Sequence, residues 1–252
     1  DDVHCRTLLE KFTARGIDYT GLVRTNRPTT TKIRVIGGHQ QMLRLDFEDA
    51  SAVDGDYMKQ YLSYIDGKLN ESMDCVIISD YGKGSCTEFA AQHIIRAAHD
   101  HGVPVIIDPK GTQWAKYKDA DYITPNLKEI NEVLLEPIAN EDFDVEKAAR
   151  YVMRKFSIRN LILTRSEKGL SIVRGDEVAH IPTHAQEVFD VSGAGDTVIA
   201  VFGLALAGGL KPADGAYLAN LAASVVVSKV GTYAVSREEL LAVLDREEGV
   251  TA

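Results

Sequence analysis

The stretch DVSGAGDTVIAVFGLALAGG, Asp190 to Gly209, sets three small residues and a carboxylate in front of a long apolar run. The apolar run predicts a buried helix that ends at the closing pair of glycines. Its beginning is unusual, because Gly193 and Gly195 carry a cost in backbone entropy where Ser or Thr would cap a helix better. Close approach of a ligand to bare backbone would explain both glycines.

The start of this helix is a candidate anion site. Small residues at a helix N-terminus leave the backbone N–H groups of Gly193, Ala194 and Gly195 unpaired, and the helix dipole adds about half a positive charge there. Asp196 in the first turn has two interpretations. It complements the helix dipole, and it also stands where a general base would activate a hydroxyl group beside a bound anion. These residues alone leave both interpretations open.

Composition narrows the class of protein. The 252 residues are 45% hydrophobic and 26% charged, as expected for an ordinary globular protein with one large domain or with one domain and a small appendage. A formal net charge of −9 argues against nucleic acid or an anionic membrane as a partner. No apolar run approaches the ~20 residues that span a bilayer, and no signal-peptide pattern opens the chain. Cys5, Cys75 and Cys86 lack metal-ligand spacing, so we expect reduced thiols in a cytoplasmic protein.

Predicted strands alternate with predicted helices around the quoted stretch, which indicates an α/β fold with a mainly parallel sheet. Strands are expected at 75–79, 103–108, 121–124 and 160–164, with a β-ribbon at 170–182 and a hairpin of 31–36 and 41–47 around Gly37-Gly38. Helices are expected near the start of the chain, at 57–69, 88–101, 146–156 and 213–229, from Leu127, from Ala194 and after Ser236.

Polar residues follow each predicted strand of the sheet. They are Ser79-Asp80, Asp108-Pro109-Lys110, Thr124-Pro125-Asn126 and Thr164-Arg165-Ser166. Ligands of open α/β sheets bind along this edge, so it is a candidate site, although polar loops are also the ordinary way for strands to end.

A nucleotide would have to be held without the common phosphate-binding loops. The sequence has no GxxxxGK[ST], and no GxGxxG follows a predicted strand. In TPNLKE (124–129), Asn126 and Glu129 have the spacing of a capping box. Alternatively, Glu129 orients water on a divalent ion while Asn126 approaches phosphates. The segments LTRSEKG (163–169) and DPKG (108–111) are likewise compatible with plain turns.

The order of these segments resembles the PfkB/ribokinase family of sugar kinases. A strand and NxxE, a strand and T-x-S-x-x-G, a ribbon, D-x-x-G-A-G-D opening an apolar helix, and a helix ending near KVGT follow one another from about Cys75 to the end. DVSGAGDT (190–197) is similar to that family's C-terminal signature. The resemblance implies a ribokinase-like fold, a twisted and mostly parallel sheet flanked by helices, with a small β lid to which the hairpin at 31–47 contributes.

Within that family, the sequence is most similar to the D-glycero-β-D-manno-heptose 7-phosphate kinases of bacterial lipopolysaccharide synthesis. The resembling segments are PTTTKIRVIGGHQQMLRLDFED (28–49), SDYGKG (79–84), DPKGTQWAKY (108–117), TPNLKE, LTRSEKG and PTHAQEVFDVSGAGDT (182–197). The resemblance implies transfer of the ATP γ-phosphate, with Mg²⁺, to the anomeric hydroxyl of heptose 7-phosphate, which gives the 1,7-bisphosphate.

The resemblance also implies roles for single residues. Asp196 would take the proton of the sugar hydroxyl, while the amides of Gly193, Ala194 and Gly195 stabilise the transferring phosphoryl group. The residues implied at ATP are Asn126, Leu127, Lys128, Glu129 (which acts on Mg²⁺ through water), Thr164, Ser166, Gly169, Asn220 in the adenine pocket, and Lys110. A phosphorylated sugar needs cationic groups, and the substrate-binding candidates are Lys83, Asp80, Arg44, Arg34 and Arg165.

Two departures and two alternatives accompany this interpretation. The family's first signature, which carries a sugar-binding Asp, is expected upstream of Asp1. Bifunctional members add a C-terminal adenylyltransferase domain, of which the sequence up to Ala252 holds no trace. The alternatives are a kinase for another sugar or a nucleoside, and a catalytically silent binding module, against which the intact GAGD and NxxE motifs argue. A homodimer is compatible with the sequence.

Overall fold

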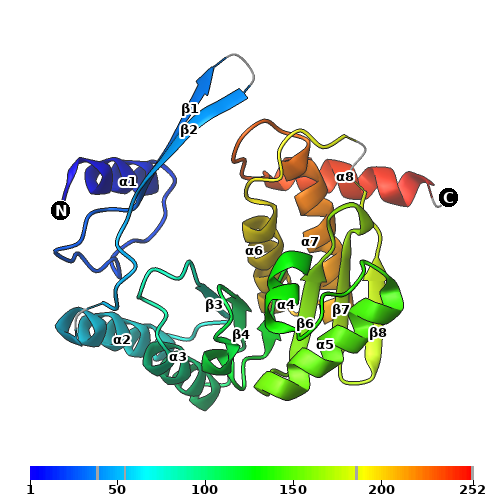
Figure 1. The fold of residues 1–252 in the computed structure, drawn as a ribbon, viewed down its shortest axis with the longest axis horizontal. Coiled ribbons are helices and arrows are strands. Elements are labelled where there is room, and N and C mark those ends of the chain that lie inside the picture. The colour runs from blue at the N-terminus through cyan, green and yellow to red at the C-terminus, as the bar shows by residue number, and fades with distance from the viewer. Residues whose placement is uncertain (38–39, 54, 185–186, 251–252) are drawn as a thin grey trace.

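A six-stranded sheet in the order β3-β4-β5-β6-β7-β8 forms the centre of the protein (Figure 1). The computed structural model describes residues 1–37, 40–53, 55–184 and 187–250. Its central strands are β3 (Val76–Ser79), β4 (Val105–Asp108), β5 (Tyr122–Ile123), β6 (Asn160–Thr164), β7 (Leu170–Arg174) and β8 (Glu177–Ile181). β3 to β6 run parallel, and β7 and β8 extend the sheet as an antiparallel ribbon. The predicted α/β fold is confirmed, with the ribbon as the antiparallel part.

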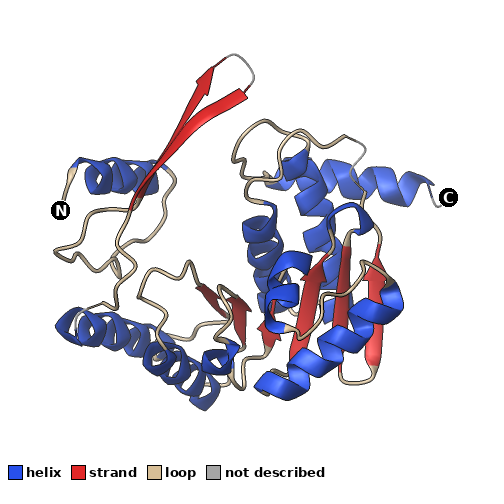
Figure 2. Cartoon of the chain, in the orientation of Figure 1, coloured by secondary structure: helices blue, strands red, loops and turns tan. Residues whose placement is uncertain are grey.

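Helices lie on both faces of the strands (Figure 2). The α-helices are α1 (Val3–Ala14), α2 (Gly55–Leu69), α3 (Glu88–Asp100), α4 (Leu127–Val133), α5 (Asp142–Phe156), α6 (Ala194–Ala207), α7 (Pro212–Val227) and α8 (Arg237–Val250). Sequence order equals strand order from β3 to β6, so the connecting helices α3 and α5 fall on one face. The chain then returns after β8 to cover the other face with α6 and α7.

Two short helical turns escaped the prediction. They are the 3₁₀ turns η1 (Trp114–Tyr117) and η2 (Ser166–Lys168). A single turn lacks the apolar periodicity from which longer helices are recognised, so the sequence predicts a plain turn for the segment that contains η2 and no structure for η1. The α5 helix also begins at Asp142, earlier than expected. Asp142 and Asp144 occupy its first turn, where negative charge complements the helix dipole.

Alternating side chains along the strands fill two separate cores. Val105 and Ile107 of β4 pack into the core under α3 and α5, whereas Ile106 between them packs into the core under α6 and α7. All three are fully buried, and each such burial contributes roughly 1.5–3 kcal/mol. The buried residues of α6, among them Val198, Ile199 and Phe202, pack against the sheet and α7, which accounts for the apolar side of this helix.

The hairpin forms a two-stranded sheet of its own, apart from the central one (Figure 1). It consists of β1 (Thr31–Gly37) and β2 (Gln40–Phe47), while Gly38 of the predicted turn lies outside the described residues. Ile33 pairs with Leu45 and Val35 with Leu43, which aligns their side chains on one face. All four are exposed, so the hairpin has an uncovered apolar face.

All three cysteines are free, as expected. Cys5 is buried, while burial raises the pKa of Cys75 to about 11 and that of Cys86 to about 12. Among the helices of the described part of the chain, none combines the length and apolarity that crossing a membrane requires.

Candidate active site

The polar residues after the parallel strands come together at one edge of the sheet. Asp80 follows β3 and its backbone N–H donates to the Asp108 carbonyl at the end of β4 (3.0 Å). Asn126 and Thr164 form a parallel bridge after β5 and β6. The Thr124 amide donates to the Ile107 carbonyl (2.8 Å) and links the two pairs. Together these contacts join four strand ends into a continuous row, at the edge where open α/β sheets bind their ligands.

Asp196 reaches this row from the first turn of α6. The Tyr81 hydroxyl, from the loop after β3, donates to Asp196 Oδ1 at 2.9 Å. Burial and the bond to Asp196 both raise the pKa of Tyr81, which keeps its hydroxyl a donor at neutral pH. An exposed carboxylate is thereby held in one orientation by a residue 115 positions away in the chain.

The backbone before Asp196 has the open character that the glycines predict. Gly193 has φ +84°, a left-handed value that an L side chain rarely adopts, and a Cβ on Gly195 would meet nothing within 4 Å. Among the described residues, the amides of Gly193 and Gly195 donate to no main-chain acceptor outside the helix. The Ala194 amide differs from the expectation, because it donates to the Val191 carbonyl at 3.2 Å.

Asp108, at the end of β4, also belongs to this row, and no sequence motif assigns it a role. Burial, together with the nearby charges of Glu129 and Asp196, raises the pKa of its carboxyl to about 7. The positive charge of Lys110 acts in the opposite direction without cancelling the effect. Negative charge is therefore concentrated where β4, α4 and α6 meet.

Glu129 and Asn126 form the predicted capping box at the start of α4. The Asn126 side chain accepts from the Glu129 amide at 2.9 Å, and Glu129 Oε2 accepts from the Asn126 amide at 3.1 Å. The other carboxylate oxygen, Oε1, accepts from Lys110 Nζ at 3.1 Å. The cap thus exists, and the same carboxylate also connects α4 to the loop after β4.

Asp80 departs from the expectation of a substrate ligand. Its Oδ1 accepts from the Gly82 amide (2.6 Å), and its Oδ2 accepts from Lys116 Nζ (2.5 Å) and the Tyr117 hydroxyl (2.7 Å). Burial alone would raise the pKa of this carboxyl, but these donors together hold it below its ordinary value. With 4% of its surface exposed, Asp80 shapes the loop after β3 instead of facing a ligand.

The residues expected at the nucleotide lie in two places: around a pocket beside α4, and next to Pro182. A pocket of about 550 Å³ is lined by Leu127, Lys128, Asn131 and Glu132 of α4 and by Ser166 after β6. Gly169 and Asn220 both lie beside Pro182, whose carbonyl accepts from Asn220 Nδ2 at 2.7 Å. A Cβ on Gly169 would lie 2.1 Å from the Ile181 carbonyl oxygen, so only glycine fits there.

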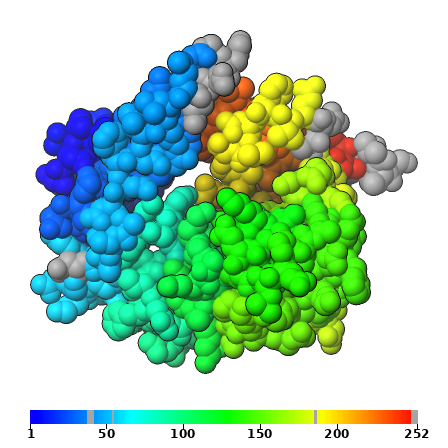
Figure 3. Space-filling view, viewed as in Figure 1, coloured from blue at the N-terminus to red at the C-terminus, as the bar shows by residue number. Residues whose placement is uncertain are grey.

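The basic candidates for sugar binding divide into two groups. Lys83 Nζ pairs with Glu48 at 2.5 Å and Arg44 with Asp46 at 2.9 Å, both on or beside the hairpin. Arg34, directly across from Arg44, lies within electrostatic reach of Asp190 before α6. Figure 3 shows the surface hollowed between this blue part and the yellow segment that leads into α6. Arg165 is not part of the group, because its guanidinium is enclosed among residues of α5, β7 and β8.

A second pocket, of about 520 Å³, lies between α2 and α3 and is lined by Met58, Leu62, Phe89 and His93 among others. It contains none of the expected site residues.

The residues of the row are compatible with Mg²⁺ bound through water. The described residues contain no group of three or more His, Cys, Asp or Glu side chains placed to hold a metal ion. Mg²⁺ keeps several of its waters and is bound in many sites by one or two carboxylates with substrate phosphates. The concentration of charge from Asp108, Glu129 and Asp196 is one that a hydrated divalent cation would offset.

Sequence reasoning missed Tyr81, Asp108 and Lys116. Asp108 ends a predicted strand, and that position was a usable signal. Tyr81 and Lys116 act on partners far away in the sequence, so no local pattern could have indicated them.

Comparison with known proteins agrees with this geometry. Residues 1–239 match the model of the pfkB family carbohydrate kinases. The chain is 41% identical over 244 residues to the bifunctional protein HldE of Geobacter sulfurreducens, and 42% identical over 217 residues to that of Actinobacillus succinogenes. These matches cover 96% and 86% of this chain but 49% and 44% of the relatives, so the chain spans about half the length of the curated relatives it matches.

Solved structures share the fold. Phosphofructokinase-2 from Escherichia coli in complex with potassium superposes with a TM-score of 0.82 at 16% identity, over 98% of this chain and 80% of that one. Ribokinase from Thermotoga maritima gives 0.75 at 25% identity, over 97% and 78%. The ribokinase-like fold and the resemblance are thus confirmed, and the chain belongs to the pfkB family of carbohydrate kinases.

Proposed function

We propose that this chain phosphorylates D-glycero-β-D-manno-heptose 7-phosphate at the anomeric hydroxyl, using ATP and Mg²⁺, to give the 1,7-bisphosphate. The single observation that carries the proposal is Asp196, held by Tyr81 at the open N-terminus of α6 beside the strand ends. The specific sugar rests on the resemblance of six long segments to the heptose 7-phosphate kinases and on the identity to the HldE proteins.

In the proposed reaction, Asp196 accepts the proton of the C1 hydroxyl while its oxygen attacks the γ-phosphate. The amides of Gly193 and Gly195 donate to the transferring phosphoryl group at the positive end of the α6 dipole. Ala194 joins them only if its amide leaves the Val191 carbonyl. Little covalent chemistry is needed in phosphoryl transfer, so positioning and charge stabilisation dominate the rate.

ATP would lie along α4 and the turn after β6. Leu127, Lys128 and Ser166 line the pocket there, Thr164 and Asn126 adjoin it, and Lys110 faces the phosphates from the loop after β4. Gly169 and Asn220 would border the adenine beside Pro182. When bound, Mg²⁺ offsets charge on the phosphates, and Glu129 would orient one of its waters.

The phosphate already present on the sugar would meet the basic group at the hairpin. Lys83, Arg34 and Arg44 are exposed or half-buried. Arg34 and Arg44 lie on the hairpin, and Lys83 pairs with Glu48, the residue that follows β2. Lys83 is the first to test, because it follows β3 and pairs with Glu48 of the segment after β2. Asp80 and Arg165 are left out of the proposed sugar site for the reasons above.

The experiment uses the full-length protein with ATP and a panel of acceptors: heptose 7-phosphate, unphosphorylated heptose, fructose 6-phosphate and adenosine. We expect turnover of heptose 7-phosphate, with ³¹P NMR locating the new phosphate at C1. Lys83→Ala should raise the KM of that sugar about tenfold by loss of one charge-assisted bond, with the KM of ATP unchanged. Equal use of both heptoses would overturn the phosphosugar assignment.

The alternatives give different results in the same experiment. A kinase for another sugar or a nucleoside would prefer a different acceptor. A silent binding module would bind ATP in calorimetry without transferring phosphate to any acceptor.

The exposed apolar face of the hairpin supports a homodimer as part of the proposal. A two-stranded sheet gains little stability by itself, and exposed apolar rows of this kind mark protein interfaces. A second copy of the chain would cover Ile33, Val35, Leu43 and Leu45 with the same residues.

A further inference from the structure

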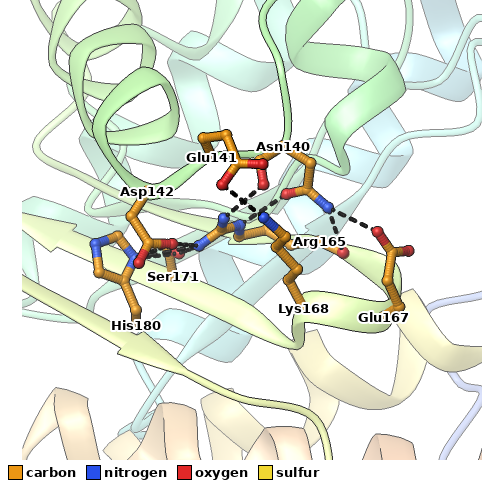
Figure 4. A network of polar contacts seen from close by, with 8 residues as sticks. All are labelled: Asn140, Glu141, Asp142, Arg165, Glu167, Lys168, Ser171 and His180. Carbon is orange, nitrogen blue, oxygen red and sulfur yellow. Dashed lines mark hydrogen bonds and ion pairs between the residues drawn. The ribbon is translucent and has the colours of Figure 1, made fainter.

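The Arg165 side chain is the most completely enclosed charge among the described residues, with 1% of its surface exposed. Figure 4 shows it pointing into a group of polar residues from three elements. Nε donates to Asn140 Oδ1 (2.9 Å) and one terminal nitrogen to the Asn140 carbonyl (3.1 Å). The other terminal nitrogen donates to Asp142 Oδ1 (2.6 Å) and Ser171 Oγ (3.0 Å).

Two further features fit a guanidinium at this place. The same terminal nitrogen lies 3.3 Å from His180 Nδ1 on β8, which must accept because a guanidinium has only donors. The hydrogen bond from Arg165 lowers the pKa of Asp142, so this carboxylate stays charged and balances the buried cation. Burying an Arg without such a partner would be strongly unfavourable.

The segment 140–142, at the start of α5, also contacts the backbone of Arg165 and the residues that follow it. Asn140 Nδ2 donates to the Arg165 carbonyl (3.0 Å) and to Glu167 Oε1 (3.2 Å). Lys168 Nζ pairs with Glu141 at 2.8 Å. Three consecutive residues, 140–142, therefore contact both the side chains and the main chain of the turn that leads from β6 to β7 (Figure 4).

This turn contains left-handed backbone conformations that surrounding contacts must stabilise. Ser166 has φ +53°, a left-handed value that is uncommon for a residue with a side chain. Gly169 has φ +78° and lies directly against the end of β8. Such backbone persists only where its surroundings determine it, and the bonds from Asn140 and Arg165 supply that determination.

The turn has two sides with different partners. Ser166 lines the pocket next to α4, and Thr164 adjoins Asn126. None of the side-chain partners of Arg165 lines that pocket. The Arg165 guanidinium thus contacts one side of the turn. The other side of the turn faces the pocket beside α4, where ATP would lie.

We propose that Arg165 is a positioning residue for ATP: through Asn140, Asp142 and Ser171 it fixes the turn from Thr164 to Gly169 in the shape that contacts the nucleotide. The inference rests on the proposed function, because it assumes that ATP occupies this pocket. Lysine cannot substitute, since it offers one flexible point charge where the site uses a planar fork with donors in several directions.

The test compares Arg165→Lys with a matched control, Arg150→Lys, in the full-length protein. Arg150 of α5 also binds a carboxylate, Glu146, and main-chain carbonyls, those of Gly175 and Asp176, but at the far turn of the ribbon. Both changes keep the charge and lose a fork of hydrogen bonds. Only Arg165→Lys alters the turn beside the pocket.

We expect Arg165→Lys to raise the Kd of ATP in calorimetry, and the KM of ATP, about tenfold, which corresponds to about 1.4 kcal/mol. The KM of the sugar should stay within twofold. Asn140→Ala, a milder change at a half-buried residue, should raise the same two constants by a smaller factor. Arg150→Lys should lower the Tm without changing either constant.

Two results separate the inference from the function on which it rests. If both Arg variants lose Tm while the Kd of ATP is unchanged, Arg165 is a structural residue only and the inference is wrong. If the unsubstituted protein binds no ATP in calorimetry, the proposed function itself fails. If Arg165→Lys does not fold, Asn140→Ala decides the question by the same Kd.

Discussion

At the scale of a single residue, the two interpretations of Asp196 can be separated by a matched pair of variants. Asp196→Asn keeps the volume but cannot accept a proton, so kcat should fall at least ~10²-fold with little change in the Kd of ATP. Asp214→Asn is the control, because Asp214 occupies the same first-turn position in α7. Both variants should lose a similar few tenths of a kcal/mol of dipole stabilisation. Equal activity of the two variants would leave Asp196 a helix-start residue only.

Asp108 predicts an unusual dependence of stability on pH. Its folded pKa of about 7 lies above the ordinary value of 3.8 for this carboxyl group, so between these pH values the folded state binds the proton that the unfolded state has lost. Stability from this group is therefore present below pH 4 and falls as pH rises to 7, by at most about 4 kcal/mol. In Asp108→Asn this fall should disappear. Urea unfolding from pH 4.5 to 7.5 with EDTA present measures it, and parallel curves for both proteins would contradict it.

At the scale of an element, α4 allows a test of whether Glu129 acts only as a capping residue or also on Mg²⁺. Glu129→Gln can still accept from the Asn126 amide, so the capping box and the Tm should be retained. Loss of the charge should move the Mg²⁺ requirement of activity several-fold upward, because hard cations prefer carboxylate oxygens. Titration of activity with Mg²⁺ gives the result. A lower Tm with unchanged Mg²⁺ dependence would make Glu129 a capping residue alone.

Elements were also the scale at which the sequence was most informative. The strand ends, the capping box at Asn126 and the open start of α6 each follow from local patterns, and the structure contains all three. The roles of Tyr81 and Lys116 depend on partners 115 and 36 positions away. Arg165 was assigned to the sugar because a basic residue after a strand is equally compatible with a ligand or with a buried network. Only tertiary packing distinguishes these cases.

At the scale of the whole molecule, the apolar face of the hairpin predicts self-association. Val35→Lys places a charge in the middle of that face and should convert a dimer into a monomer in sedimentation velocity runs, since a buried unpaired charge costs several kcal/mol. Leu135→Lys is the control, at an exposed leucine outside the hairpin. A monomeric unsubstituted protein at micromolar concentration would refute the homodimer.

The shielded thiols make the molecule convenient for optical work. A cysteine is alkylated as its thiolate, and the raised pKa values of Cys75 and Cys86, with the burial of Cys5, leave all three slow toward maleimides at neutral pH. A new thiol at Met42→Cys, on the exposed strand β2, would react first. A fluorophore attached there would report whether the surroundings of the hairpin change as sugar and nucleotide bind, with every native cysteine left in place.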